Sequence, residues 1–167
     1  MPVDHKEKAF EAAIEHHLIT SAGYVKAELG NFHQERALDP TQFIPFVEET
    51  QEKTWARLKK LLAERTEEIV LDDLAKAMDT RGSLDVLRHG FKCYGELIRA
   101  AYFKPATRMN PDDLALYQKN RLTVVRQLLF KATSSQALDL TLCLNGIPIV
   151  TAELKNPMSS LFRRGPL

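Results

Sequence analysis

The chain has 167 residues and a net charge of +1 at pH 7, with 44% hydrophobic and 27% charged residues. This composition is typical of one globular domain with a substantial core. The low net charge argues against a protein that binds nucleic acid by bulk electrostatics, so any DNA contact has to come from a local patch.

The sequence contains neither a recognisable signal peptide nor an apolar run of membrane-spanning length. Its two cysteines, Cys93 and Cys143, lie far apart in apolar surroundings and are interpreted as reduced thiols of the core. We therefore expect a cytoplasmic protein that has no membrane among its partners.

A first helix is predicted over residues 4–22, with Asp4 as its N-cap and Gly23 at its end. Five residues, four of them apolar, recur at helical spacing: Phe10, Ala13, Ile14, His17 and Leu18. Glu11 and Glu15 are four residues apart on a neighbouring stripe of this helix. By spacing alone, such a pair more often belongs to a solvated acidic face than to a site.

Several short helices are predicted between about residues 39 and 90, after an irregular polar stretch. Asp39-Pro40 is typical of a helix start, and Pro45 is expected to break or kink that helix. Apolar stripes at helical spacing predict the later helices, the last of which ends near Gly90. These helices are expected to form an insertion that covers a sheet.

Strands are predicted in the last part of the chain. Extended structure is expected around residues 98–103, followed by a helix from Asn110-Pro111 to about residue 119. The β-branched run over residues 122–130 is interpreted as the strand that precedes a hairpin. The positive side chains near this strand are the candidates for contacts with DNA phosphates: Lys119, Arg121, Arg126 and Lys131. A solvated strand edge is an equally good interpretation of each.

The stretch over residues 138–157 contains two apolar runs separated by Asn145-Gly146, the strongest short-range signal for a β-hairpin. Side chains on a strand alternate between its faces. The leucines of the first strand therefore share one face and Asp139 lies on the other, while Glu153 and Lys155 share a face of the second strand.

The register of the hairpin decides whether these charged groups meet. A two-residue turn would pair Leu144 with Ile147 and separate Asp139 from Glu153. A shift by one residue puts the charged groups on one face, and a buried apolar face is expected to select it. We therefore expect a three-residue loop with Gly146 left-handed, or an equivalent bulge.

Two carboxylates and an ammonium group on one sheet face suit a Mg²⁺-dependent phosphodiesterase. Mg²⁺ is usually bound through one or two carboxylates and keeps several waters. It activates a bound water and neutralises charge that develops on the phosphate. Lys155 could orient that water or contact the phosphate. A salt-bridged hairpin in which Lys155 only neutralises the carboxylates fits the spacing about as well.

The motif D-L-T-L-C-L-N-G-I-P-I-V-T-A-E-L-K-N-P, which begins at Asp139, resembles the nuclease signature of the restriction (R) subunit of type I restriction enzymes. That family is a branch of the PD-(D/E)xK nucleases. The segments F-E-A-A-I-E-H-H-L-I-T-S-A-G-Y and N-R-L-T-V-V-R-Q-L are similar to the same family. The resemblance implies that Asp139 and Glu153 bind the metal and that Lys155 is catalytic. It also implies that a glutamate of the first helix, with Glu11 favoured, points toward the site as a supporting group.

The implied fold is α+β, a restriction-endonuclease-like mixed sheet flanked by helices. The implied function is that of an endonuclease module with Mg²⁺ as cofactor, acting on double-stranded DNA together with methylation and specificity subunits. In this family the chain continues with a supporting helix, a strand and two motor lobes, from which this sequence departs after Pro157. It contains no G-x-x-x-x-G-K-[ST] phosphate loop, so ATP would serve only motor domains absent from it.

We therefore expect residues 1–167 to form a single, partial nuclease domain that is truncated after the hairpin. An uncovered sheet edge would favour self-association. The alternative function is a catalytically silent assembly or DNA-binding module whose charged triad is structural. Metal binding that depends on Asp139 distinguishes the two.

Overall fold

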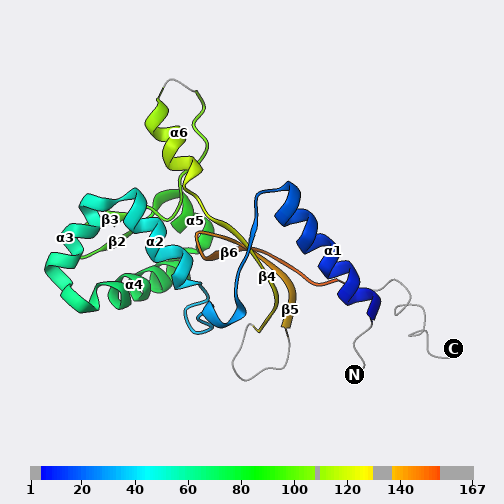
Figure 1. Ribbon diagram of the computed structural model, residues 1–167. Helices are drawn as coiled ribbons and strands as arrows, with labels where there is room; N and C mark the ends of the chain where they lie inside the picture. Colours follow the sequence, from blue (N-terminus) through cyan, green and yellow to red (C-terminus); the bar gives the residue numbers. More distant parts are fainter. Residues whose placement is uncertain (1–4, 108–109, 130–136, 155–167) are drawn as a thin grey trace.

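The computed structural model describes residues 5–107, 110–129 and 137–154. Its elements in chain order are α1 (His5–Ser21), β1 (Val25–Lys26), the 3₁₀ turn η1 (Leu29–Asn31), α2 (Pro40–Thr50), α3 (Glu52–Leu62), the 3₁₀ turn η2 (Ala63–Arg65), α4 (Thr66–Arg81), α5 (Ser83–His89), β2 (Phe91–Cys93), β3 (Glu96–Ile98), α6 (Pro111–Gln118), β4 (Leu122–Leu129), β5 (Ala137–Leu144) and β6 (Ile147–Ala152). The fold is α+β, as predicted (Figure 1).

The main sheet has four strands in the order β1-β4-β5-β6, and β2 pairs with β3 in a separate small sheet. β4, β5 and β6 are antiparallel neighbours, whereas β1 is parallel to β4. The strand predicted over residues 122–130 and both strands of the predicted hairpin are thus confirmed. β1 gives no sequence signal, because it has only two residues and exists through its pairing with β4.

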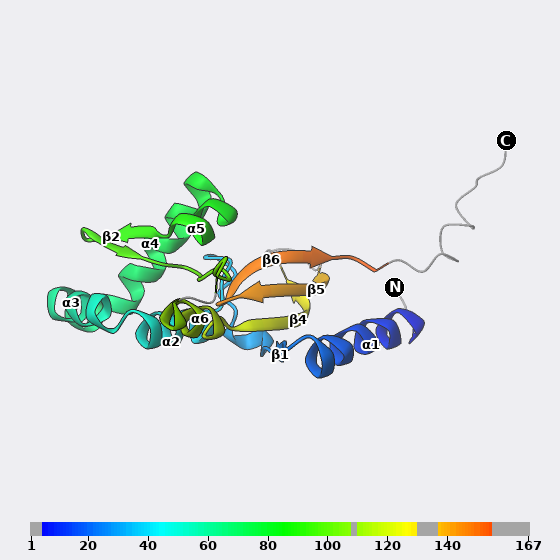
Figure 2. The ribbon, with the colours of Figure 1, turned by 90° about the horizontal axis from the view of Figure 1, so that it is seen from above.

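Helices α2 to α5 and the β2–β3 hairpin gather beyond one end of the main sheet, whereas α1 lies near its other end (Figures 1 and 2). The larger apolar core is formed by this helical group, and Ile147 of β6 belongs to it. In the described residues, the other buried cluster consists of Ala27, Val125 and Leu128, with Phe32 packed against it. The end of the sheet near α1 therefore has little apolar core of its own, and polar contacts hold it.

Two of the predicted helix starts are confirmed. Asp39 caps α2, its Oδ1 accepting a hydrogen bond of 2.9 Å from the Thr41 N–H. Asn110 caps α6 in the same way, with a 3.0 Å bond from the Asp112 N–H. Both side chains satisfy an N–H group that has no partner within the helix. Asp4, the N-cap predicted for α1, lies outside the described residues.

Two boundary predictions differ from the structure. The break expected at Pro45 does not occur, because a proline removes one helical hydrogen bond while the buried side chains on both sides of it keep α2 packed; the kink, the other expected outcome, stays a prediction. The extended structure expected around residues 98–103 ends at Ile98. Beyond it, side chains replace a partner strand: Gln51 bonds the backbone of Arg99, and Asn120 bonds the backbone of Tyr102.

Both cysteines are free and buried, in agreement with their interpretation as core thiols. Burial raises the pKa of the Cys93 thiol, and that of the Cys143 thiol, to about 12. Both thiols therefore stay protonated near neutral pH and are poor nucleophiles. No helix within the described ranges is long and apolar enough to cross a membrane.

Candidate functional site

The hairpin turns tightly. Leu144 pairs with Ile147 across Asn145-Gly146, whose φ angles are +51° and +80°. Positive φ at both central residues is the requirement of the tight hairpin turn that favours Asn-Gly. The three-residue loop expected here is therefore wrong.

Contacts with distant segments fix this turn. The buried Asn145 side chain accepts a hydrogen bond of 2.7 Å from the Arg121 N–H and donates one of 2.9 Å to the Ala100 carbonyl. The Gly146 carbonyl accepts a 2.9 Å bond from the Asp39 N–H. The turn is thus held against the start of α2, which the local sequence does not reveal.

A bulge in β6 supplies the shift of register instead. Cys143 pairs with Pro148 but Leu142 pairs with Val150, so Ile149 is the extra residue. Pro148 has no N–H to donate to a ladder, so a bulge beside it is less costly than elsewhere. The shift continues to the pair of Leu140 and Ala152. If this register continued by one residue beyond the end of β6, Asp139 of β5 would lie opposite Glu153.

Opposed residues of an antiparallel pair project from the same face of the sheet. The bulge is the second of the two expected routes to a shifted register, and it is confirmed. The ladder ends at the pair of Leu140 and Ala152, so the placement of Asp139 and Glu153 on one face stays a prediction. Burial of one apolar face, the expected cause of the shifted register, is only partly right. Thr141 and Cys143, on the Asp139 face of β5, are buried, whereas Val150, on the leucine face, is exposed. Burial of a single apolar face does not select the register, since elements cover parts of both faces.

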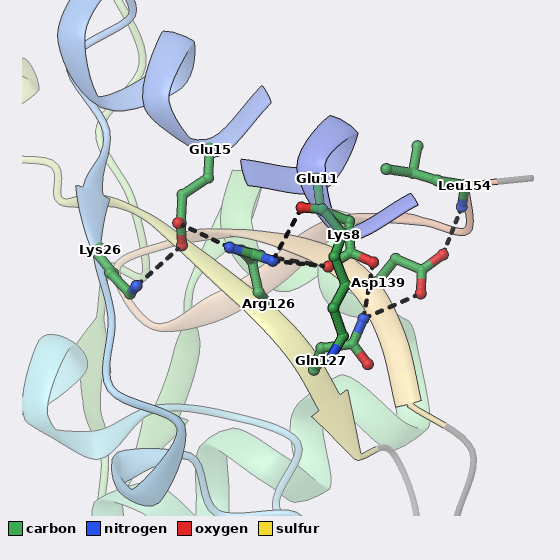
Figure 3. A network of polar contacts seen from close by, with 8 residues as sticks. All are labelled: Lys8, Glu11, Glu15, Lys26, Arg126, Gln127, Asp139 and Leu154. Carbon is green, nitrogen blue, oxygen red and sulfur yellow. Dashed lines mark hydrogen bonds and ion pairs between the residues drawn. The ribbon is translucent and has the colours of Figure 1, made fainter. Parts of the chain in front are cut away.

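The Asp139 carboxylate accepts two hydrogen bonds (Figure 3). One of 2.6 Å comes from the Leu154 N–H to Oδ2, and one of 3.3 Å comes from the Gln127 side chain to Oδ1. The same Gln127 nitrogen donates a 3.0 Å bond to Oε1 of Glu11 on α1. The structure thus brings Glu11 into the surroundings of Asp139, with Gln127 between them.

Glu11 and Glu15 do not form a solvated face, because both are buried between α1 and the sheet. Arg126 of β4 lies between them (Figure 3). Its guanidinium donates to Oε2 of Glu11 at 3.2 and 3.3 Å and to Oε2 of Glu15 at 3.4 Å. Lys26 of β1 lies 3.5 Å from the second oxygen of Glu15. The Arg126 donors are therefore directed at these carboxylates rather than at a DNA phosphate.

Comparison with known proteins identifies the family of the chain. The family model described as Type I restriction enzyme R protein N terminus (HSDR_N) matches residues 5–163. The chain belongs to this family. No curated protein and no solved structure matched it.

Membership of the R protein N-terminal family confirms the resemblance carried by the first helix and by the hairpin motif. Among the residues that the resemblance marks, the structure links Glu11 to Asp139 through the Gln127 side chain. Lys155, the residue implied to be catalytic, lies outside the described residues. Its role stays a prediction.

The phosphate candidates do not behave alike. Lys119 is exposed at the end of α6, and its contact with a DNA phosphate stays a prediction. Arg121 forms a 2.6 Å ion pair with Glu49 of α2, beside the turn rather than beside Asp139. Lys131 lies outside the described residues.

The candidate metal ligands can be compared with the coordination requirements of a metal ion. Within the described part of the chain, no group of three or more His, Cys, Asp or Glu side chains could hold a metal. A closed four-ligand zinc site is thus not formed by these residues. Mg²⁺ needs fewer protein ligands, commonly one or two carboxylates. Both hydrogen bonds to Asp139 come from N–H donors, and each carboxylate oxygen has two lone pairs, so Asp139 keeps acceptor capacity for a cation. Asp139 and Glu153 therefore fit Mg²⁺.

Sequence reasoning overlooked Gln127. Its one available signal is its position: counting along the β4–β5 ladder, Gln127 lies opposite Asp139. A polar residue next to a suspected metal ligand on the neighbouring strand is a candidate for orienting that ligand.

Proposed function

We propose that this chain is the nuclease module of a type I restriction enzyme R subunit and that it hydrolyses phosphodiester bonds of double-stranded DNA with Mg²⁺. Family membership supports the class of protein. The observation that supports the site is the bulge in β6, because it shifts the register to one in which Glu153 would lie opposite Asp139. Mg²⁺ is commonly bound through one or two carboxylates and keeps several waters.

Asp139 and Glu153 would hold the metal, which when bound would supply Lewis-acid stabilisation of the phosphate and activation of a water. Asp139 is oriented for this by the Leu154 N–H and the Gln127 amide. Lys155, adjacent in sequence, would orient the attacking water or contact the phosphate, as the resemblance implies. The exposed Lys119 would contribute to a phosphate contact further from the bond that is cut.

Membership also supports a setting for this chemistry. We propose that the module acts within a complex with methylation and specificity subunits, and that the specificity subunit selects the DNA target. ATP would be used by motor domains of the R subunit rather than by the residues of this chain.

A plasmid-nicking assay tests the proposed reaction. The chain alone is expected to nick supercoiled plasmid weakly at most, and that nicking should require Mg²⁺ and stop in EDTA. Asp139→Asn should slow nicking by roughly 100-fold, which corresponds to about 2.7 kcal/mol of transition-state stabilisation. Asp79→Asn is the matched control, because it makes the same change at an exposed position on α4.

Nicking that persists in EDTA, or that is equal in the wild-type chain and Asp139→Asn, would contradict the assignment. Absence of any Mg²⁺-dependent nicking would favour the alternative, a catalytically silent module in which Asp139 only satisfies the Leu154 N–H.

A further inference from the structure

Gln127 has an unusual backbone conformation for a residue within a strand. Its φ angle is +55°, although it lies inside β4, between the ladder pairs of Arg126 with Leu140 and of Leu128 with Leu138. A non-glycine residue in this left-handed region is strained. Such strain persists only where the surrounding structure maintains it, and it is found most often at functional sites.

The left-handed conformation has a direct consequence for the side chains. Consecutive strand residues normally point to opposite faces. Here Arg126 and Gln127 both reach Glu11, at 3.2 Å and 3.0 Å respectively. The break in alternation therefore lets Gln127 contact the helix that Arg126 contacts while also donating to Asp139 on the neighbouring strand.

The chemistry of the bridging group matters as much as its position. The side-chain nitrogen of Gln127 carries two hydrogens, so it can donate to Glu11 and to Asp139 at once. It joins two carboxylates without adding a positive charge near the proposed metal site. A lysine in this place would neutralise Asp139 and compete with a divalent cation for it.

Both carboxylate oxygens of Glu11 accept hydrogen bonds, which fixes the position of its side chain. Its Oε2 accepts from Arg126, and its Oε1 accepts from Gln127. With a side chain only 3% exposed, Glu11 is fixed between the helix and the sheet. The contacts therefore run in one line from Arg126 through Glu11 and Gln127 to Asp139.

We propose that Gln127 is a positioning residue for the metal-binding carboxylate of Asp139, held in its strained conformation by Glu11. This inference rests on the proposed function, in which Asp139 binds a divalent cation. It assigns Glu11 a supporting role through Gln127 rather than direct contact with the metal. Loss of a group that orients a metal ligand typically lowers metal affinity 10- to 100-fold.

Calorimetric titration of the intact chain with Mn²⁺ tests the proposal, with Gln127→Gly as the informative variant. Glycine adopts positive φ without strain, and this gain should offset much of the lost hydrogen bond to Glu11, so the stability of Gln127→Gly should stay within about 1 kcal/mol of that of the wild type. The Mn²⁺ dissociation constant should nevertheless rise by roughly 10-fold or more, because the bridging amide is gone. If Gln127 were purely structural, Gln127→Gly would instead lower the stability of the fold or leave the Mn²⁺ dissociation constant unchanged.

Two further variants complete the design. Gln127→Leu removes the amide at nearly constant size and should weaken Mn²⁺ binding as Gln127→Gly does. Gln127→Asn keeps an amide and tolerates the left-handed conformation, but it is shorter, so its affinity should lie between those of the wild type and Gln127→Leu. Thermal unfolding of each variant in EDTA reports stability separately from metal binding.

The outcomes separate this inference from the proposed function. Mn²⁺ binding that is lost in Asp139→Ala but unchanged in both Gln127→Gly and Gln127→Leu would overturn the positioning role alone. Failure of the wild-type chain to bind Mn²⁺, or binding that survives Asp139→Ala, would overturn the proposed metal site and the positioning role with it. Binding lost in Asp139→Ala and weakened in both variants, with the stability of Gln127→Gly preserved, supports the inference.

Discussion

Arg126→Met is expected to lower the free energy of unfolding by about 3 kcal/mol. The Arg126 side chain is 24% exposed, while those of Glu11 and Glu15 are 3% and 10% exposed. Removing the guanidinium leaves two carboxylates in an interior position, with Lys26 near one of them. Loss of one partner of a buried ion pair costs far more than the pair itself contributes. Urea unfolding followed by circular dichroism measures the change.

Two controls make the Arg126 result specific. Lys119→Met removes an exposed cation and should change the stability by no more than about 0.5 kcal/mol. Combining Arg126→Met with Glu11→Met and Glu15→Met replaces the whole network with apolar groups and should recover most of the loss. If Arg126→Met is as stable as the wild type, these ion pairs do not hold α1 on the sheet.

Gly146→Ala is expected to destabilise the fold by at least about 2 kcal/mol, for two reasons that act together. The φ angle of Gly146 is +80°, which disfavours any L side chain. A Cβ there would also overlap the backbone oxygen of Asp39, the residue that caps α2. The strain cannot be relieved by rotation of a side chain, because the obstacle is backbone.

Gly95→Ala is the matched control for the overlap between a Cβ at Gly146 and the backbone of Asp39. Gly95 has a φ of +84° in the β2–β3 turn, but open space surrounds the place where its Cβ would lie. Its substitution should therefore cost only the conformational penalty, about 1 kcal/mol. Denaturant unfolding of both variants gives the difference. Equal losses would mean that the approach of Gly146 to Asp39 does not constrain the hairpin.

Much of the hairpin could be predicted from the sequence, because its signals are local. Asn145-Gly146 identifies the turn, and the alternation of leucines with Asp139 identifies the strand and its faces. A shift in register was also predicted, from the burial of one apolar face, although elements in fact cover parts of both faces. The choice between a longer loop and a bulge could not be predicted. It is decided by Asp39, Ala100 and Arg121, which bond the turn from elsewhere in the chain.

The contacts around Asp139 were harder to predict from the sequence than the hairpin was. A pair of glutamates on a helix gives the same pattern whether it faces solvent or an arginine of a strand more than a hundred residues away. Gln127 was overlooked because its role depends on a left-handed φ, which glutamine seldom adopts and which no local pattern signals. Family resemblance did point to Glu11. Its contacts with Arg126 and Gln127 required the structure.

The proposed nuclease site requires a divalent cation bound between Asp139 and Glu153. Titration calorimetry of the wild-type chain and of Glu153→Gln with Mn²⁺ tests this claim, because Glu153 is exposed and its substitution should leave the fold intact. We expect one Mn²⁺ site in the wild-type chain and a dissociation constant at least roughly 10-fold higher in Glu153→Gln, a loss of about 1.4 kcal/mol. Equal Mn²⁺ binding by the two chains, or no binding by the wild type, would contradict the account.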